Sequence, residues 1–516
     1  MPKIRSKADE LAAAGVELPH AINRYVTSSI NHSWKDTLNA LPVCKTADRK
    51  SYKLHFDPPT CEAIEAQMDD HLFSAIEGET RILHIKGHRV VLIGLGSDCN
   101  DRSVLRWAGA RAAQAARELH CPNLVLNRGT IPGVSWPTAA ADMAEGAELG
   151  SFTFQCYKKS PSLQQGTAHA LRLHFVDQSH SAKFQNAIRD VVTCASATNF
   201  ARHLANHPPN VINPSTLVQI CRELAKGCGL ACKIITFADA QRLSMGGLCS
   251  VGRGSPDKPA IIILEHKPAV SANRRPIAVV GKAVTFDTGG ISIKPAADMG
   301  AMKYDKCGGM AAIGVAAAAA MLKLPRHIVC AVPTAENMVD GDAYRPGDII
   351  RMYNGKTVDV TNTDAEGRLI LADAISYVCR HYKPSALIDL ATLTGGVITA
   401  LGGVYAGLMS NNDELAEQLI NAGMVTDEWL WRLPLNTRYR KLLDSPHADM
   451  VNSGGREAHP IQGGMFLQEF VSSGTAWAHL DIAGVSHPRK EYRYLKGEQA
   501  SGFGVRLLVE FIKSCR

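Results

Sequence analysis

The sequence predicts an α/β protein with two domains, a smaller N-terminal α/β domain and a larger C-terminal α/β domain whose mixed, largely parallel sheet is covered by helices. The chain has 516 residues, more than one hydrophobic core usually organises. Apolar segments of strand length alternate with helix-like segments, which is typical of such sheets. A long predicted helix is followed by two prolines within 206–210, where a helix has to end. We therefore expect a first domain at 1–180, a linker helix at 181–205 and a second domain at 206–516.

The composition is that of a folded globular protein. Hydrophobic residues make up 46% of the chain and charged residues 20%, which excludes disorder as a description of the whole chain. The formal net charge of +7 is spread along the sequence, so it favours nucleic-acid binding only weakly. No apolar segment of signal-peptide length follows the basic N-terminus, and no apolar run reaches the length of a membrane span. We therefore expect a cytoplasmic protein without a membrane partner.

The chain contains fourteen cysteines, scattered without paired CxxC units. Cys228 and Cys232, with Cys221 before them, come closest to a zinc knuckle, but its second half is missing. We therefore expect free thiols in a reducing compartment.

The N-terminal half predicts an α/β domain entered by a β-hairpin. Two apolar segments, 81–85 and 89–94, are separated by a short turn, which predicts antiparallel strands. The other predicted elements are strands at 52–56, 123–126, 152–157 and 171–176 and helices at 104–119 and 137–150. Gly94 and Gly96 begin a dinucleotide-binding pattern, but its third glycine position holds Cys99 and no acidic partner is evident. We interpret them as an ordinary βα turn.

The sequence of the second domain predicts alternating strands and helices up to the C-terminus. The predicted strands are 232–237, 259–265, 277–286, 327–332 and 386–390, and the predicted helices are 214–226, 308–322, 366–382 and 503–513. In sheets of this kind, ligands gather at the carboxyl ends of the strands.

Acidic residues stand at three predicted strand-to-helix junctions of this domain. Asp287 follows an apolar strand, Asp305 precedes a glycine-rich helix start, and Asp364 and Glu366 precede another helix. If these four carboxylates converge, they raise one another's pKa unless cations neutralise them. Two divalent cations such as Zn²⁺, Mn²⁺ or Mg²⁺ would do so, and such a pair commonly promotes water attack on a carbonyl or phosphoryl centre. A single Asp in this position is more often a helix cap or a surface charge, so the prediction depends on the cluster.

The cations Lys282, Lys294 and Arg368 accompany the acids, and the sequence patterns of other catalytic sites are incomplete. Lys294 and Arg368 are candidates to polarise a carbonyl oxygen and to hold an anion, with a solvated charge or a structural ion pair as the alternative. The segment 290–294 lacks the closing glycine of a nucleophile elbow. The segment 355–357 lacks the first glycine of a P-loop, and no HExxH is present. His479 lies in an apolar strand, where a hydrogen-bonded structural role is favoured.

The segments 280–294 and 362–371, with Asp305 and its neighbours between them, closely resemble the leucyl aminopeptidase (cytosol aminopeptidase, M17) family. The family signature is similar to the run Asn-Thr-Asp-Ala-Glu-Gly-Arg-Leu at 362–369. The resemblance extends from about residue 206 to the end of the chain, and the first half is compatible with the family's variable N-terminal domain.

The resemblance implies a two-metal aminopeptidase that acts on peptides with a free N-terminal amine. It implies that Asp287 and Glu366 bridge two metal ions, that Asp364 completes the looser site, and that Lys282 and Asp305 complete the tighter one. The implied metals are Zn²⁺ or Mn²⁺, with Mg²⁺ as a further candidate at the looser site. Lys294 would polarise the first peptide carbonyl, and Arg368 would hold a bicarbonate ion that relays a proton.

The resemblance further implies a homohexamer and a leucine-like preference. The residues matching the family's pocket for the first side chain are Met302, Thr392, Leu393 and Gly395. Tyr304 and Cys307 depart from the residues common beside Asp305, and the segment 461–465 predicts a more open pocket wall. Two alternatives stay open: a narrow dipeptidase such as a cysteinylglycine hydrolase, and a DNA-binding regulator with the same fold.

Overall fold

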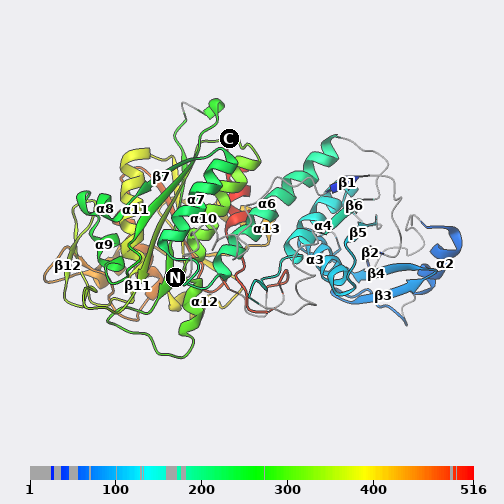
Figure 1. Cartoon of the computed structure of the whole chain (residues 1–516), viewed down its shortest axis with the longest axis horizontal. Coiled ribbons are helices and arrows are strands. Elements are labelled where there is room, and N and C mark those ends of the chain that lie inside the picture. Colours follow the sequence, from blue (N-terminus) through cyan, green and yellow to red (C-terminus); the bar gives the residue numbers. More distant parts are fainter. Residues whose placement is uncertain are drawn as a thin grey trace, which may run out of the picture. The chain divides into compact units, whose positions relative to one another are not determined.

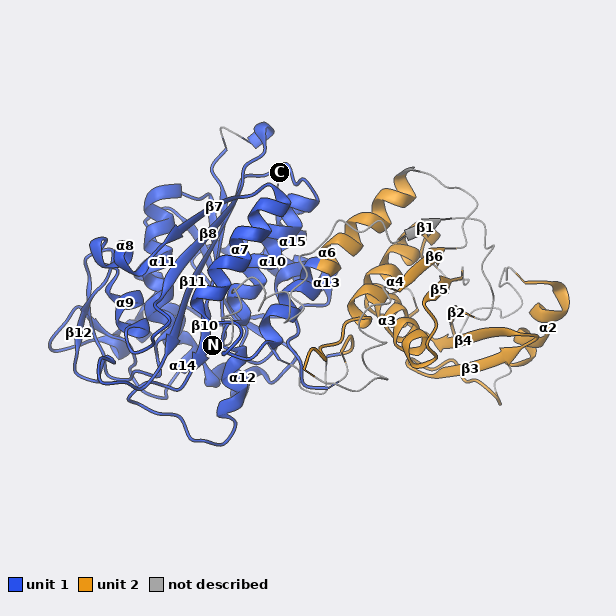
Figure 2. Ribbon diagram, in the orientation of Figure 1, with its two compact units in different colours: residues 1–19, 197–492, 497–516 blue, residues 20–196, 493–496 orange. Residues whose placement is uncertain are grey.

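The structure is a computed structural model with two compact units. The described residues are 25–27, 36–45, 56–68, 71–99, 101–127, 131, 133–157, 171–175, 182–271, 274–487, 492–495 and 497–515. Unit 1 includes residues 197–492 and 497–516, and unit 2 includes residues 20–196 and 493–496 (Figure 2). The boundary between Ser196 and Ala197 falls inside one helix, α6 (Ala182–Asn206). Within the described ranges, no helix is both long and apolar enough to cross a bilayer.

Unit 2 is built on a six-stranded sheet with the order β1-β6-β5-β2-β4-β3 (Figure 1). Its strands are β1 (Tyr25–Thr27), β2 (Thr37–Val43), β3 (Thr80–Ile85), β4 (His88–Gly94), β5 (Asn123–Leu126) and β6 (Arg172–Phe175). Every neighbouring pair is parallel except β3 and β4, which form the predicted hairpin. Within the described residues, the helices of this unit before α6 are α2 (Pro58–Ala66), α3 (Arg102–Glu118) and α4 (Trp136–Gly150). The predicted helices at 104–119 and 137–150 are thus confirmed.

One predicted strand of unit 2 is wrong. Residues 152–157 form no strand. The rings of Phe154 and Tyr157 instead pack edge to face, with their centres 5.9 Å apart. The position of these two aromatic residues in the sequence therefore reflects a local ring contact. The predicted strand at 52–56 lies outside the described residues except for Phe56, which is in a bend.

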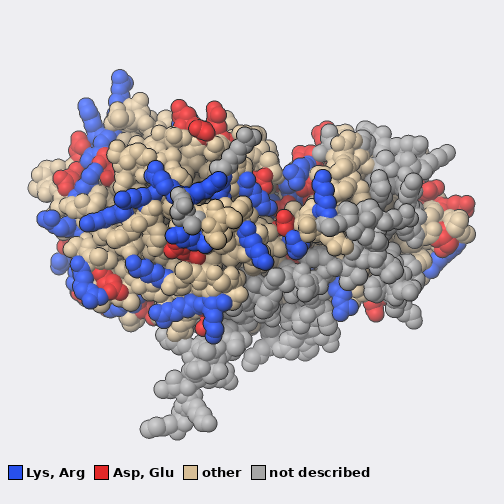
Figure 3. Space-filling view, turned by 90° about the horizontal axis from the view of Figure 1, so that it is seen from above, with Lys and Arg blue, Asp and Glu red and all other residues tan. Residues whose placement is uncertain are grey.

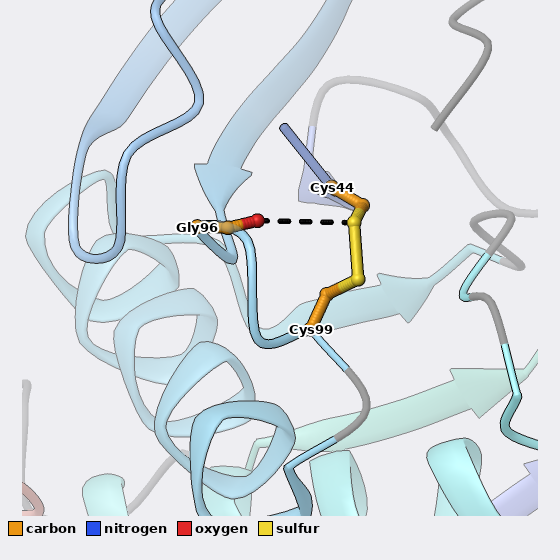
Figure 4. The surroundings of a disulfide bond; sticks show 3 residues. All are labelled: Cys44, Gly96 and Cys99. Carbon is orange, nitrogen blue, oxygen red and sulfur yellow. Dashed lines mark hydrogen bonds between the residues drawn. A yellow bond between two sulfur atoms is a disulfide. The ribbon is translucent and has the colours of Figure 1, made fainter. Parts of the chain in front are cut away.

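A disulfide joins Cys44 to Cys99 in unit 2 (Figure 4). Cys44 follows β2 and Cys99 follows β4, and these two strands are neighbours in the sheet. The expectation that all the cysteines are free is therefore wrong for this pair, because the parallel sheet brings together residues 55 positions apart. The other cysteines keep their thiol groups.

Unit 1 contains a mixed nine-stranded sheet with the order β16-β15-β18-β14-β9-β11-β8-β7 and β10 beside β11 (Figure 1). Its strands are β7 (Ala231–Ile235), β8 (Ala260–His266), β9 (Ile277–Gly281), β10 (Ala283–Asp287), β11 (Ile328–Asn337), β14 (Ala386–Ala391), β15 (Ala406–Ser410), β16 (Leu430–Arg432) and β18 (Ala476–Asp481). The central strands are parallel, whereas β8 runs antiparallel to β7 and β11, and β15 runs antiparallel to β18. A small second sheet consists of β12 (Ile349–Arg351), β13 (Thr357–Asp359) and β17 (Met450–Val451). The predicted mixed, largely parallel α/β architecture is confirmed.

Helices cover the central strands of this sheet. The helices of unit 1 after α6 are α7 (Pro214–Cys228), α8 (Phe237–Arg242), α9 (Gly246–Gly252), α10 (Cys307–Met321), α11 (Gly367–Tyr382), α12 (Gly395–Leu401), α13 (Asp413–Thr426), α14 (His459–Gln468) and α15 (Val505–Ser514). Ala278 and Val280 of β9 share one apolar core with α11. Since side chains alternate along a strand, the buried Val279 faces the other side, and α10 also packs on β9.

Three predicted strands have different bounds. The predicted strand at 277–286 is two strands, β9 and β10, interrupted at Lys282. The predicted strand at 232–237 ends at Ile235, because Thr236 begins α8 with a capping box to Asp239. The predicted strand at 327–332 extends to Asn337. The first and third differences matter for the site, because they place Lys282 and Asn337 beside the acids.

Charged side chains are mixed over the surface. On the face drawn in Figure 3, Lys and Arg side chains lie in several separate groups with Asp and Glu side chains among them. This distribution agrees with a net charge of +7 that is spread along the sequence.

Candidate metal centre

The four predicted acids lie together at one edge of the large sheet of unit 1. Asp287 is the last residue of β10, Asp305 follows the 3-10 helix η4 (Met299–Tyr304), and Glu366 is the N-cap of α11. Oxygen atoms of Asp287, Asp364 and Glu366 all lie within 4.8 Å of one another. Asp287, Asp305 and Glu366 are buried, and Asp364 is partly exposed. The three junctions singled out in the sequence therefore supply one cluster of carboxylates.

Lys282 connects Asp305 to Glu366. It stands in the break between β9 and β10, where its N–H donates to Leu390 O at 3.0 Å. Its Nζ lies 2.7 Å from Asp305 Oδ1 and 2.8 Å from Glu366 Oε1, and donates to Thr392 O at 2.9 Å. Burial lowers the pKa of Lys282, but Asp305 and Glu366 outweigh it and raise the pKa above its usual range. In this arrangement the amine is an ammonium ion.

The limited space around Lys282 explains a glycine of the signature run. A Cβ on Gly367 would lie 2.5 Å from Lys282 Cε, closer than atoms can pack. Any larger residue at position 367 would displace the amine from Glu366.

Lys294 occupies the other side of the cluster. Its Nζ lies 2.9 Å from Asp287 Oδ2 and also pairs with Asp364. Burial lowers its pKa, but Asp287 and the neighbouring acids raise it above its usual range. Burial raises the pKa values of Asp287, Asp305 and Asp364, despite these ammonium groups.

The donor set fits a pair of divalent cations. Four carboxylates face two ammonium groups, which leaves a formal charge of minus two when all are ionised. Asp305 Oδ2 is buried and has no hydrogen-bond partner in the described part of the chain, and such an orphaned oxygen is costly unless a ligand satisfies it. Carboxylate oxygens at these separations are suitable ligands for Zn²⁺, Mn²⁺ and Mg²⁺.

Residues not predicted from the sequence hold the acids in place. Asn337 Nδ2 donates to Asp287 Oδ1 at 2.8 Å and to Thr363 O at 3.0 Å. Thr363 Oγ1 donates to Gly289 O at 2.6 Å and accepts from Ser292 N at 2.8 Å. These bonds tie the loop after β10 to the signature run. A polar residue at the end of the apolar strand β11 was the available signal for Asn337, but the predicted strand stopped too early to reveal it.

Arg368 is a buried cation beside the cluster. Its side chain is 1% exposed, Nη1 donates to Asn452 O at 2.8 Å, and Nε has no hydrogen-bond partner among the described residues. Burial lowers the pKa of Arg368 to about 10, so it remains charged at neutral pH. A buried guanidinium with an unused donor fits an anion.

The residues matched to the substrate pocket lie around the loop after β14. Thr392 Oγ1 donates to Asp305 Oδ1 at 2.7 Å, which places this loop against the acids. A Cβ on Gly395 would meet nothing within 4 Å, so there is open space beside it. Met302 lies in η4, where its carbonyl accepts from Asp305 N at 3.2 Å.

The more open pocket wall predicted for 461–465 stays a prediction, and two glycines of this segment lie against larger side chains. A Cβ on Gly463 would lie 2.8 Å from Leu393 Cδ2, and one on Gly464 would lie 2.8 Å from Met409 Sδ. Larger side chains from neighbouring segments therefore occupy the space that these glycines leave, and Leu393 packs against α14 for this reason.

His479 has the structural role that the sequence indicated. Its Nδ1 lies 2.6 Å from Asp389 Oδ1, and Asp389 Oδ2 accepts from Trp477 Nε1 at 2.7 Å. Both ring systems and the carboxylate are fully buried, so this network organises the core between β14 and β18.

Comparisons with known proteins agree on one family. The model of the cytosol aminopeptidase family, catalytic domain, matches residues 199–509, and that of the family's N-terminal domain matches residues 43–161. A probable cytosol aminopeptidase of Geobacter sulfurreducens is 39% identical over 480 residues, covering 89% of this chain and 95% of the relative. A probable cytosol aminopeptidase of Rhizobium johnstonii is 42% identical over 430 residues, covering 83% of this chain and 85% of the relative.

Two solved structures extend the likeness to the whole fold. The bottromycin maturation enzyme BotP in complex with Mn matches with a TM-score of 0.81 and 31% identity, over 93% of this chain and 99% of BotP. A mutant of tomato leucine aminopeptidase matches with a TM-score of 0.83 and 28% identity, over 97% of this chain and 99% of the tomato chain.

Proposed function

The chain belongs to the cytosol aminopeptidase family and is a metal-dependent aminopeptidase, and we propose that it removes leucine-like N-terminal residues from peptides by means of two bound divalent cations. One observation carries the proposal. Carboxylate oxygens of Asp287, Asp364 and Glu366 lie within 4.8 Å of one another, and Lys282 joins Asp305 to Glu366. A site with this negative charge and with carboxylates this close together is suited to two cations rather than one.

Two ligands would be shared by both cations, and the others would each bind one cation. Asp287 and Glu366 would bridge the cations, Asp364 would belong to the looser site, and Lys282 and Asp305 would belong to the tighter one. Zn²⁺ or Mn²⁺ suits both sites, Mg²⁺ is a further candidate at the looser one, and a Mn complex of BotP supports Mn²⁺. When bound, the pair supplies a nucleophilic water at neutral pH and neutralises charge on the attacked carbonyl. Lys282 is a ligand only as a neutral amine, so loading of its site releases a proton.

Two cationic side chains complete the catalytic group. The Lys294 side chain is 21% exposed, against 3% for Lys282, so its ammonium is accessible to a substrate carbonyl oxygen and stabilises the negative charge that develops there. Arg368 would hold a bicarbonate ion through its Nε, which has no hydrogen-bond partner among the described residues. The bound ion would supply a group able to relay the proton of the reaction. Met302, Thr392, Leu393 and Gly395 line the pocket for the first side chain.

The experiment is hydrolysis of a leucyl chromogenic amide by variants of the metal-loaded protein. Asp364→Ala and Glu366→Ala should abolish turnover and reduce the bound metal, whereas Glu417→Ala, which removes an exposed acid on α13, should leave both unchanged. Treatment with a chelator should abolish turnover, and Mn²⁺ or Zn²⁺ should restore it. Full activity of either site variant would contradict the proposal.

The breadth of the substrate range needs its own comparison. A general aminopeptidase should hydrolyse leucyl peptides of two to six residues at similar rates, whereas a narrow dipeptidase should hydrolyse only dipeptides such as cysteinylglycine. The open space beside Gly395 favours an apolar side chain of leucine size over a small one.

We further assign the protein to the cytoplasm as a homohexamer, as its family membership suggests. Light scattering coupled to size exclusion should give a mass near six times the 55.6 kDa of one chain. A monomer that retains full activity would remove this part of the proposal and leave the chemistry of the site unaffected.

A further inference from the structure

A cavity lies at the far end of α11 from the candidate metal centre. Its volume is about 770 Å³, and it is lined by the last turns of α11, by Tyr353 and Asn354, by Arg275, and by the segment 469–475 that leads into β18. Glu366 caps the first turn of α11 and Arg380 lies in the last. A helix of this length extends roughly 24 Å, so the cavity is separate from the metal centre. Its volume falls within the usual range of about 300 to 1,000 Å³ for small-molecule sites.

Three cations line this cavity from two separate segments. Arg275 precedes β9, whereas Arg380 and Lys383 stand at the end of α11. Among the described residues, no carboxylate forms an ion pair with any of the three. Unpaired cations that converge on one hollow are the usual means of recognising phosphate and carboxylate groups.

The guanidinium groups of both arginines are held in position. Arg275 Nε donates to Lys383 O at 2.8 Å and Nη2 donates to Pro384 O at 2.7 Å. The Arg380 guanidinium carbon lies 5.8 Å from the centre of the Tyr353 ring. Because these contacts restrict the side chains before any ligand binds, less conformational entropy is lost on binding.

The acid in the cavity wall does not cancel this charge. Glu469 pairs with Lys356 and, at 3.0 Å, with Arg440, so two further cations already neutralise it. The hydroxyl groups of Ser472 and Ser473 line the same wall, and Phe470 adds an apolar surface. The cavity therefore offers positive charge, hydroxyl donors and a place for a carbon skeleton.

A simpler role accounts for part of this arrangement. Cations in the last turn of a helix offset the partial negative charge of its C-terminus, and this would explain Arg380 and Lys383. It also covers the contacts of Arg275 with Lys383 O and Pro384 O at the same helix end. It does not explain why the three cations line a hollow of about 770 Å³ without a carboxylate partner among the described residues.

We propose that this cavity binds a small polyanion that carries phosphate-like or carboxylate groups. The proposal does not depend on the aminopeptidase activity, since none of its residues belongs to the metal centre. Two probes separate the possible chemistries: inorganic sulfate represents tetrahedral oxyanions, and benzene-1,3,5-tricarboxylate places three carboxylates around a flat ring. The carboxylates of the second probe are too far apart to chelate one metal ion, which limits binding at the metal centre.

The test is isothermal titration of each probe into the full-length, metal-loaded protein at low and at physiological salt. The double variant Arg380→Glu/Lys383→Glu should weaken binding about tenfold or more, since two attractive charges become repulsive. The milder pair Arg380→Gln/Lys383→Gln should weaken it by a smaller factor. Lys226→Glu, which reverses an exposed charge on α7, should change it little.

The outcomes separate clearly. Binding of sulfate alone assigns the cavity to phosphate-like ligands, and binding of the tricarboxylate alone assigns it to carboxylates. In either case, weaker binding of that probe by the double variants supports the proposal. Absence of binding by both probes overturns it, as does binding that the double variants and Lys226→Glu reduce equally. Thermal unfolding midpoints of the variants close to that of the unchanged protein show that the fold is intact.

Discussion

The carboxylate of Asp481 accepts a hydrogen bond from Thr394 Oγ1 at 2.6 Å, and this contact fixes the loop that carries the substrate residues. Asp481 Oδ1 also accepts from Leu393 N at 3.2 Å and from Thr394 N at 3.4 Å. The same loop presents Thr392 O to the amine of Lys282. A residue at the end of β18 thereby controls the geometry of a site whose acids lie more than a hundred positions earlier.

Asp481→Ala should lower kcat/KM and Mn²⁺ affinity by about 10- to 100-fold, the usual effect of removing a residue that orients metal ligands. Three backbone N–H groups and a hydroxyl lose their acceptor, so the loop moves away from Lys282. Asp481→Asn retains one acceptor oxygen and should recover part of the loss. Metal retained after dialysis is the second measurement, and the exposed Asp413→Asn serves as the control. Unchanged metal affinity in Asp481→Ala would rule out the positioning role.

Lys294→Ala should reduce kcat by about 10²- to 10³-fold with a smaller change in KM, because the ammonium stabilises charge mainly in the transition state. Lys294→Arg keeps the positive charge and should retain more activity. The comparison uses steady-state kinetics on the leucyl amide. An effect confined to KM would show that Lys294 only binds the substrate.

Lys282→Met should destabilise the metal-free protein by about 3 to 5 kcal/mol, since it leaves the buried carboxylates of Asp305 and Glu366 without their cation. The matched control is Lys356→Met, whose partner Glu469 is 27% exposed and whose loss should cost less than about 1 kcal/mol. The midpoints of denaturant unfolding in chelator give both values. Equal destabilisation by the two substitutions would contradict the burial argument.

His479→Gln should destabilise the protein more at pH 6 than at pH 9. Burial lowers the pKa of His479, but Asp389 outweighs it and raises the pKa above 6.5 in the folded state. The charged pair therefore contributes fully below the unfolded value of 6.5 and is lost as the pH rises through the raised folded value. Unfolding midpoints of both proteins, measured in chelator at the two pH values, test this. A difference between the proteins that grows with pH would contradict the direction of the shift.

Gly463→Ala should change the preference for the first side chain. The new Cβ would lie 2.8 Å from Leu393 Cδ2, so Leu393 has to move toward the substrate pocket and reduce its volume. We expect KM for leucyl substrates to rise more than KM for alanyl substrates. Gly341→Ala is the control, because a Cβ there meets nothing within 4 Å. Equal changes for both substrates would mean that Leu393 does not line the pocket.

Local patterns in the sequence identified much of the site. Asp364, Glu366 and Arg368 stand within one short run at the start of α11, so their proximity follows from chain connectivity. Asp287 was recognisable because an apolar strand ends there and two glycines follow. Most helices and strands of unit 1 could be predicted for the same reason, since periodicity within a segment reports which of its faces is buried.

Other features depended on residues distant in the chain. Lys282 interrupts the apolar run in the sequence, but the break of the strand there could not be predicted from it, because the break arises where β9 pairs with β14 and β10 does not. The close approach of Gly463 to Leu393 could not be predicted either, because Leu393 comes from another loop. The pairing of Cys44 with Cys99 likewise depends on β2 and β4 lying side by side.

The order of the residues by itself determined the class of the fold and the chemistry available to the site, because the spacing of hydrophobic residues and the functional groups are properties of short segments. Only the folded chain decided that Lys282 neutralises Asp305 and Glu366, and that Asn337 and Asp481 hold the loops on either side. These relationships join separate strands, and their distances are set by strand pairing and core packing rather than by spacing along the chain.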